Sequence, residues 1–259
     1  MINLYIVADK DAIARLAFQD LIIEINSSEN VTLGLATGSS PCGIYELLRK
    51  NAPDVSHVTT INLDEYIGLP ADHEQSYAYF MKKELFDHLE FKQTYIPNGM
   101  NDNQEEECAR YDEVLANNVV DLQILGIGTN GHIAFNEPGT DFELTTHVTN
   151  LVSATVEANS RFFESVDDVP KTAYTMGIKS IMAAKKIILI ASGTEKASAI
   201  KAMLEGDVTT EVPASILQNH PDVTVIIDED AASLIDPSLL TRRPCCGGNC
   251  GCGREKGEI

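Results

Sequence analysis

The sequence predicts an α/β fold in which a mostly parallel sheet is covered by helices on both faces. Short apolar runs rich in β-branched residues recur along the chain, and segments with helical spacing separate them. Because the runs are apolar at successive positions, both faces of each strand are expected to be buried, as in parallel sheets. Residues 150–171 break this rhythm with an acidic turn, and we interpret them as a lid insertion over a ligand crevice.

The predicted elements follow from these patterns in chain order. The strands are expected at Ile2–Val7, Val31–Ala36, Val58–Leu63, Leu122–Ile127, Lys185–Ala191 and Val223–Asp228. Apolar residues at helical spacing predict helices within residues 9–25, 43–50, 76–89, 103–117 and 193–206. Asp9 is the expected N-cap of the first helix, and Gly206 the expected end of the last one.

We expect residues 1–240 to form a single domain and residues 241–259 to form a disordered tail. A chain of 259 residues is within the size that α/β folds reach as one unit. Glycine and cysteine dominate the tail, which has no apolar pattern to pack. Its cysteines at Cys245–Cys252 lack the widely separated pairs typical of zinc sites, so we favour reactive thiols over a metal site.

Net charge and hydropathy argue against two classes of binding partner, nucleic acids and membranes. The formal net charge of −20 argues against a nucleic-acid-binding protein, which needs a basic surface. Any anion site must therefore be built locally from a few cations and backbone N–H groups. No run reaches the ~18 apolar residues of a membrane helix. The first residues also lack the basic start of an export signal, so we expect a cytoplasmic protein.

Four loops follow predicted strands and are expected to meet at one crevice. In open parallel sheets, ligands bind at the carboxyl ends of the strands. The loops that begin there are Thr37–Pro41, Asp64–Leu69, Gly128–Gly139 and Ser192–Lys196.

The loop "GIGTNGHIAFNEPG" contains G-x-G-x-x-G at Gly126–Gly131, the pattern of dinucleotide-binding proteins. That fingerprint requires a helix continuing from the third glycine. Pro138 and Gly139 interrupt the segment soon afterwards, so a nicotinamide-dependent oxidoreductase is a weak alternative. Binding of NAD(P)H would reveal it.

The same loop offers an acid–base group at His132, since imidazole transfers protons near neutral pH. Glu137 is placed to accept a hydrogen bond from one ring nitrogen, and Asn130 to hold the ring or a ligand hydroxyl. Taken alone, a loop histidine bonded to the backbone is the commoner explanation.

The segment "NLDEYIGL" places Asp64 and Glu65 directly after a buried strand. Because neighbouring strand residues face opposite ways, only one is expected to enter the crevice, and we favour Asp64. A carboxylate in a dry pocket has a raised pKa and is a competent base. A helix-capping role is an equally good explanation of the same residues.

An anion site is predicted from "TGSSP" and "SGTEK". Thr37, Gly38, Ser39 and Ser40 precede a helix and can direct N–H and hydroxyl groups toward a phosphate. Lys196 lies near the start of another helix, where an anion would offset the unfavourable helix dipole. Arg161, in the expected lid, is a further cation for the same site.

Taken together, these motifs resemble the glucosamine-6-phosphate deaminase family from residue 1 to about residue 240. The resemblance rests on "LGLATGSSP", "NLDEYIGL", "SYAYFM", "GIGTNGHIAFNEPG", "NSRFF" and "YTMGI". It implies a modified Rossmann-like fold and the conversion of glucosamine 6-phosphate to fructose 6-phosphate and ammonia, with no metal and no cofactor. The related 6-phosphogluconolactonases share the fold, so a sugar-lactone hydrolase is the alternative.

The resemblance also implies roles for individual residues. Asp64 would move the C2 proton, His132 would open the sugar ring and Glu137 would support His132. Asn130 stands where some members carry aspartate, so His132 would have a carboxylate on one side only. Phosphate contacts would fall on Thr37, Gly38, Ser39, Ser40, Arg161 and Lys196.

Regulation is expected to differ from that of allosteric family members, which carry basic residues soon after "NEP". The corresponding residues 140–150 contain only His147 as a potential cation. We therefore expect a monomer or small homo-oligomer without that control. A non-catalytic sugar-phosphate sensor is disfavoured, since Asp64 and His132 are both present and no basic domain is attached.

Overall fold

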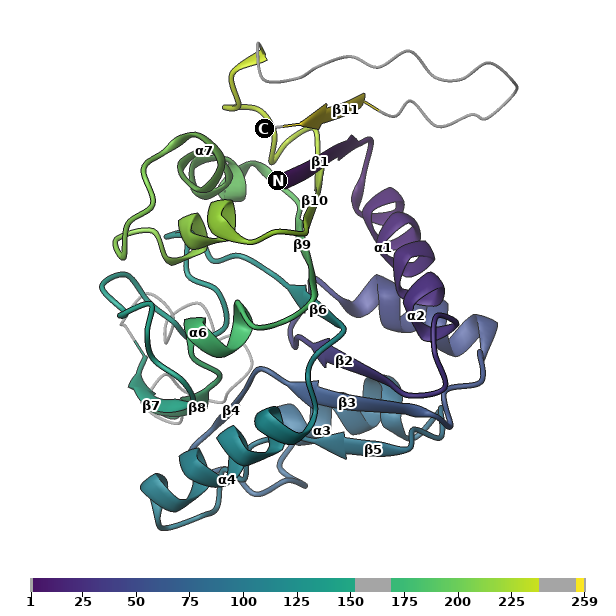
Figure 1. Cartoon of the computed structure of the whole chain (residues 1–259), viewed down its shortest axis with the longest axis vertical. Helices are drawn as coiled ribbons and strands as arrows, with labels where there is room; N and C mark the ends of the chain where they lie inside the picture. The colour runs from purple at the N-terminus through teal and green to yellow at the C-terminus, as the bar shows by residue number, and fades with distance from the viewer. Residues whose placement is uncertain (1, 152–168, 238–254, 259) are drawn as a thin grey trace.

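The computed structural model describes residues 2–151, 169–237 and 255–258. An eight-stranded sheet crosses the molecule in the order β11-β1-β10-β9-β6-β2-β3-β5 (Figure 1). All its pairings are parallel except that of β1 with β11. The predicted α/β class with a mostly parallel sheet is therefore confirmed.

The strands of this sheet are β1 (Ile2–Val7), β2 (Val31–Leu35), β3 (Val58–Asn62), β5 (Gln93–Tyr95), β6 (Leu122–Leu125), β9 (Lys186–Ala191), β10 (Val223–Asp228) and β11 (Glu255–Glu258). Every residue of β3 and β6 is buried, as expected for strands of a parallel sheet that is covered on both faces. The short edge strand β5 was not predicted, because its three residues carry no apolar pattern.

The helices are α1 (Lys10–Ile25), α2 (Cys42–Asn51), α3 (Tyr77–Met81), α4 (Gln104–Asn117), α6 (Ile178–Ile181) and α7 (Ala197–Glu205), with 3-10 turns at Thr194–Lys196 and Pro213–Asn219. In Figure 1, α1 and α2 lie on one side of the large sheet and α7 on the other. Asp9 caps α1 as predicted, since its Oδ1 accepts from the backbone N of Ala12 at 2.7 Å. The predicted helix 76–89 is shorter, because α3 passes into a π-helical turn at Lys82–Phe86.

A second, three-stranded antiparallel sheet was missed from the sequence. It consists of β4 (Asp64–Tyr66), β8 (Thr172–Thr175) and β7 (His147–Asn150), in the order β4-β8-β7. The segment after β3 is thus a strand of a new sheet rather than a loop. Leu63 links the two sheets, since its N–H donates to the carbonyl of Leu35 and its carbonyl accepts from the N–H of Met176.

Two predicted features fall largely outside the described residues. The expected lid at 150–171 overlaps residues 152–168, which include Arg161, and these are not described. Of the expected tail at 241–259, only residues 255–258 are described, and they form β11 beside β1. No helix among the described residues has the length and hydropathy needed to cross a bilayer.

The topology explains why the site lies at the carboxyl ends of the central strands. The strands β9, β6, β2 and β3 are neighbours, so the loops that leave their carboxyl ends open side by side. After β5 the chain returns to β6 on the other side of β2, which reverses the strand order. Ligand crevices form at such reversals in open α/β sheets.

Candidate active site

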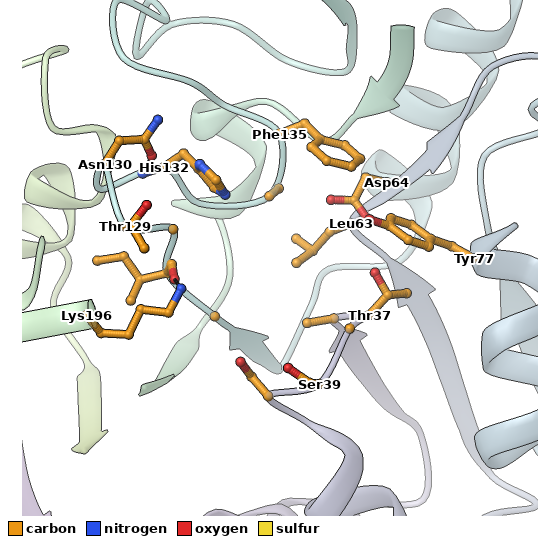
Figure 2. A pocket seen from close by; sticks show the side chains of 17 residues that line it. Thr37, Ser39, Leu63, Asp64, Tyr77, Thr129, Asn130, His132, Phe135 and Lys196 are labelled. Atoms are coloured by element: carbon orange, nitrogen blue, oxygen red, sulfur yellow. Dashed lines mark hydrogen bonds between the residues drawn. The ribbon is translucent and has the colours of Figure 1, made fainter. Parts of the chain in front are cut away.

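A cavity of about 310 Å³ opens where β2, β3, β6 and β9 end, a size suited to a small ligand (Figure 2). Eight of the predicted site residues line it: Thr37, Gly38, Ser39, Ser40, Asp64, Asn130, His132 and Lys196. Glu137 lies behind His132 and does not line the cavity. Figure 2 shows Asp64 across the cavity from His132 and Lys196, with Thr37 and Ser39 on a third side.

Asp64 occupies the first position of β4 and faces the cavity. Its side chain is buried, and its carboxylate accepts no hydrogen bond from any residue that the structure describes. Burial, followed by the charge of Glu65, raises the pKa of Asp64 to about 8. A carboxylate held dry and without donors is well suited to remove a proton from carbon.

Glu65 points away from the cavity, as the alternation along a strand requires. Its carboxylate accepts from the backbone N–H groups of Tyr66 and Tyr77, each at 2.9 Å, and of Ala78 at 2.8 Å. Burial raises the pKa of Glu65 to about 7, although these three donors act in the opposite direction. The orientation of the two side chains therefore agrees with the prediction that Asp64, and not Glu65, enters the crevice.

The loop after β6 turns tightly to present His132. The N–H of Gly128 donates to the carbonyl of His132 at 2.9 Å, and Gly131 has a φ of +86°, which favours glycine. A Cβ atom on Gly128 would lie 2.3 Å from the imidazole Nδ1. Gly128 thus leaves room for the ring, and Gly131 permits the turn.

Three polar side chains form a connected group at this loop. The Nδ2 of Asn130 donates to the Oε2 of Glu137 at 2.7 Å, and its Oδ1 accepts from the backbone N of His132 at 3.2 Å. The Nδ1 of His132 lies 3.3 Å from the same Oε2. The contact is close enough for electrostatic attraction, but its angle is not that of a hydrogen bond, and Nδ1 has no other partner among the described residues.

The dinucleotide-binding alternative is not supported by the local structure. Residues 126–146 contain no helix, and Ile133 forms an isolated bridge with Asn136 instead. The helix that should begin at the third glycine, and hold a pyrophosphate at its N-terminus, is therefore missing.

The predicted anion loop lies between β2 and α2. Gly38 has a φ of +85°, and Thr37, Gly38, Ser39 and Ser40 all reach the cavity. The hydroxyl of the buried Tyr45 donates to the carbonyl of Ala36 at 2.5 Å, which fixes the start of this loop from within α2. The loop is therefore held in shape before a ligand arrives.

Lys196 approaches the same cavity from the turn after β9. Its Nζ donates to the carbonyl of Ile127 at 2.8 Å. This turn differs from the Thr37–Ser40 loop, because the N–H of Gly193 donates to both carboxylate oxygens of Asp228, at 3.0 and 3.1 Å. That turn therefore contributes the lysine side chain rather than the N–H of Gly193.

The aromatic wall of the cavity was not predicted, although Tyr77 and Phe135 lie within two of the quoted motifs. Tyr77 and Phe135 line it, with stacked rings whose centroids are 5.9 Å apart, and Tyr66 packs on both. Tyr77 lies in a predicted helix, where an aromatic residue is usually explained by packing, and Phe135 lies between two polar motifs. Leu63, the residue before Asp64, completes this apolar side.

A buried carboxylate, an imidazole and the predicted anion loop around one cavity are the groups expected of an α/β enzyme that carries out acid–base chemistry. The profile of a family described as glucosamine-6-phosphate isomerases/6-phosphogluconolactonase matches residues 8–226. The chain belongs to this family.

Individual relatives are close. Glucosamine-6-phosphate deaminase from Bacillus cytotoxicus is 54% identical over 237 residues, which cover 92% of this chain and 90% of the relative. Its counterpart from Bacillus cereus is 53% identical over the same coverage.

Solved structures support the same family and the same fold. That of a monomeric glucosamine-6-phosphate deaminase is 42% identical, with a TM-score of 0.87, and the match covers 89% of this chain and 99% of that one. A 6-phosphogluconolactonase from Trypanosoma cruzi has a TM-score of 0.74 over 89% and 95% of the chains. At 18% identity the lactonase shows only that the fold is shared.

Proposed function

We propose that the protein is a glucosamine-6-phosphate deaminase, which converts glucosamine 6-phosphate to fructose 6-phosphate and ammonia. The observation that carries this proposal is the meeting of Asp64, His132 and the Thr37–Ser40 loop at one cavity. An aldose–ketose isomerisation needs a base at C2, a proton carrier at the ring and C1 oxygens, and an anchor at the far end. The deaminase names of the close relatives support the same activity.

The anion loop and Lys196 bind the phosphate. Serine hydroxyls and a lysine supply donors, and the start of α2 adds a favourable dipole. Arg161, outside the described residues, completes this set in our proposal. Anchoring the phosphate makes the later proton transfers effectively intramolecular, because the reacting carbons are then held at fixed places in the cavity.

His132 opens the sugar ring by moving a proton between the O1 hydroxyl and the ring oxygen. Glu137, joined to Asn130 behind the ring, supports the imidazole while it carries the proton. Asp64 then removes the proton from C2 and returns it to C1. The resulting imine at C2 is attacked by water, and ammonia leaves.

The substrate itself helps to ionise Asp64. Before the substrate binds, burial favours the protonated carboxyl, since its pKa is raised to about 8. The substrate carries an ammonium group on C2, the same carbon whose proton Asp64 must reach. A cation at that distance favours the carboxylate. Substrate binding and activation of the base are therefore coupled.

The remaining expectations stay predictions of this proposal. We expect the enzyme to work in the cytoplasm as a monomer or small homo-oligomer, and the monomeric relative is consistent with that state. We expect no metal or organic cofactor to be required. A lid formed by residues 150–171 would close over the bound sugar phosphate.

The decisive experiment follows ammonia and fructose 6-phosphate after mixing the purified chain with glucosamine 6-phosphate, with chelator present and no nucleotide. A parallel reaction offers 6-phosphogluconolactone, and the Asp64→Asn variant is the matched control. We expect ammonia and ketose in equal amounts from the wild type and neither from the variant. Lactone hydrolysis without ammonia release by folded protein would replace the proposal with the lactonase alternative.

A further inference from the structure

Glu65 is a buried acidic residue that the proposed reaction does not use. Only 2% of it is exposed, and it stands beside Asp64, whose pKa it raises. Burying a second carboxylate next to a catalytic one is costly, so its retention needs an explanation. The three backbone N–H groups that it accepts provide one.

These bonds join two elements that are distant in the chain. Glu65 lies in β4, the strand of Asp64, whereas Tyr77 and Ala78 begin α3, 12 and 13 residues later. The helix already has an ordinary cap, since the Oγ of Ser76 accepts from the N–H of Tyr79 at 3.0 Å. Glu65 is therefore not needed as the only cap of α3. Its hydrogen bonds set the position of the first turn of α3 relative to β4.

The residue placed by this link is Tyr77, which lines the cavity. Figure 2 shows its ring reaching toward Asp64, above Thr37. Its hydroxyl donates to that of Tyr66 at 3.5 Å, a long contact that a ligand oxygen at normal distance would outcompete, and the side chain of Thr37 is another polar neighbour. Burial, and then the nearby Tyr66 and Asp64, hold the pKa of the Tyr77 hydroxyl well above its usual value, so it remains a neutral donor.

We propose that Tyr77 is a substrate-contacting residue and that Glu65 is the positioning residue that holds it beside Asp64. This inference rests on the proposed function, which puts the phosphate at the Thr37–Ser40 loop and C2 at Asp64. Tyr77 lies between these two ends, so its hydroxyl meets the hydroxyl-bearing carbons in the middle of the sugar. The stacked ring of Phe135 keeps the phenol in that orientation.

The test compares two tyrosines of one cluster. Tyr77→Phe removes a hydroxyl that faces the cavity, and Tyr66→Phe removes one that does not, while both keep their rings. We expect Tyr77→Phe to lower kcat/KM for glucosamine 6-phosphate about tenfold, the effect of one hydrogen bond. Tyr66→Phe should stay within about twofold of wild type. Equal activities of Tyr77→Phe and wild type, or equal losses in both variants, would overturn the proposal.

The role of Glu65 is tested by coupling. Glu65→Gln removes an acceptor and should lower kcat/KM at least tenfold, and the double variant with Tyr77→Phe should lose less than the product of the two single losses. Ser76→Ala weakens the same helix without touching Glu65, so it should lower the Tm but leave kcat/KM within about twofold. A double-variant loss equal to the product of the two single losses would contradict a positioning role of Glu65. A loss of kcat/KM in Ser76→Ala as large as that in Glu65→Gln would also contradict it. Glu65→Asp, with a shorter reach, replaces the glutamine variant if that one does not fold.

A binding measurement separates this inference from the proposed function. Thermal shifts are recorded with inorganic phosphate and with fructose 6-phosphate for the wild type and Tyr77→Phe. We expect both proteins to respond equally to phosphate, and only the wild type to show the full additional shift from the sugar. If the wild type releases no ammonia, the deaminase assignment fails, whereas a sugar-specific loss of binding in Tyr77→Phe would still support the contact. Equal thermal shifts with fructose 6-phosphate in both proteins would overturn the proposed contact of Tyr77 with the sugar.

Discussion

The imidazole of His132 and the carboxylate of Glu137 lie 3.3 Å apart, measured from Nδ1 to Oε2. The amide of Asn130 donates to that same oxygen at 2.7 Å. His132, the proposed acid–base group, thus shares a single carboxylate oxygen with a neutral amide, and only 24% of the histidine side chain is exposed. Because Glu137 is itself buried, its charge acts on the imidazole with little screening by water.

Glu137→Gln tests this contact, since glutamine retains the size of the side chain and removes its charge. We expect kcat to fall about 10- to 100-fold, because ring opening loses the group that supports the protonated imidazole. KM should change little, since Glu137 does not line the cavity. Steady-state kinetics with ammonia detection would measure both constants. Glu143→Gln, at an exposed position paired with Lys179, is the matched control and should behave as wild type.

Gly128→Ala tests whether this glycine is needed to make room for the imidazole of His132. A Cβ there would lie 2.3 to 2.5 Å from three atoms of the imidazole, so the ring must move. We expect kcat to fall on the order of 100-fold, as displacements of about 1 Å commonly cause, while inorganic phosphate still binds. Gly126→Ala offers a comparison, since its Cβ would meet Ser40 Oγ at 3.6 Å, an ordinary contact. If both variants lose activity equally, crowding of His132 is not the reason for the glycine.

The sequence was most informative where burial dictated the pattern. The strands β2, β3, β6 and β9 are buried on both faces, so their apolar runs were easy to find, and placing ligands at their carboxyl ends led directly to the cavity. The orientation of Asp64 and Glu65 also followed from alternation along a strand.

The small sheet could not be predicted because its pairing is long-range. In β4, the residues Asp64, Glu65 and Tyr66 have no apolar alternation, and they are held by β8, which lies more than 100 residues later. The aromatic wall was missed for the same reason. Tyr77 and Phe135 meet only through the fold, and nothing in their spacing of 58 positions indicates contact.

The pH dependence of kcat/KM should report on the two carboxylates of β4. The titratable groups near Asp64 are Glu65 and, with weaker electrostatic interaction, the buried Tyr77 and Tyr111. Burial raises the pKa of Asp64 to about 8 and that of Glu65 to about 7. Asp64 must be ionised to act, so kcat/KM should rise with pH across this interval. Glu65→Gln removes a negative charge, so the rising limb of the profile should move to lower pH. An unchanged limb would show that another group controls it.

Lys196→Met tests the phosphate end of the cavity. We expect KM to rise about 10- to 100-fold, the loss typical of one charge-assisted hydrogen bond, with a smaller change in kcat. The inhibition constant of inorganic phosphate should rise in parallel, because in the proposed function phosphate alone binds at the same place. Lys201→Met, in the helix α7 that follows Lys196 and paired with Glu205 at the surface, is the control. An unchanged phosphate affinity in Lys196→Met would place the anion elsewhere.

Asp64→Asn should make the protein more stable while it abolishes exchange of the C2 proton with solvent. The pKa of Asp64 is raised on folding, from its ordinary value near 3.8 to about 8, so the native state binds more protons than the unfolded state between these values. Its contribution to stability is therefore complete below about pH 4 and is lost as the pH rises toward 8. Asparagine cannot ionise, so the variant should escape this loss.

Denaturant unfolding of both proteins between pH 4 and pH 8 would measure the difference. We expect the free energies of unfolding to be similar at pH 4 and to diverge with pH, with the variant more stable by a few kcal/mol at pH 8. Asp72→Asn, at an exposed position, controls for the removal of one negative charge from an acidic protein. If Asp64→Asn and wild type show the same pH dependence, Asp64 is not held in an unfavourable environment. Its strength as a base would then need another origin.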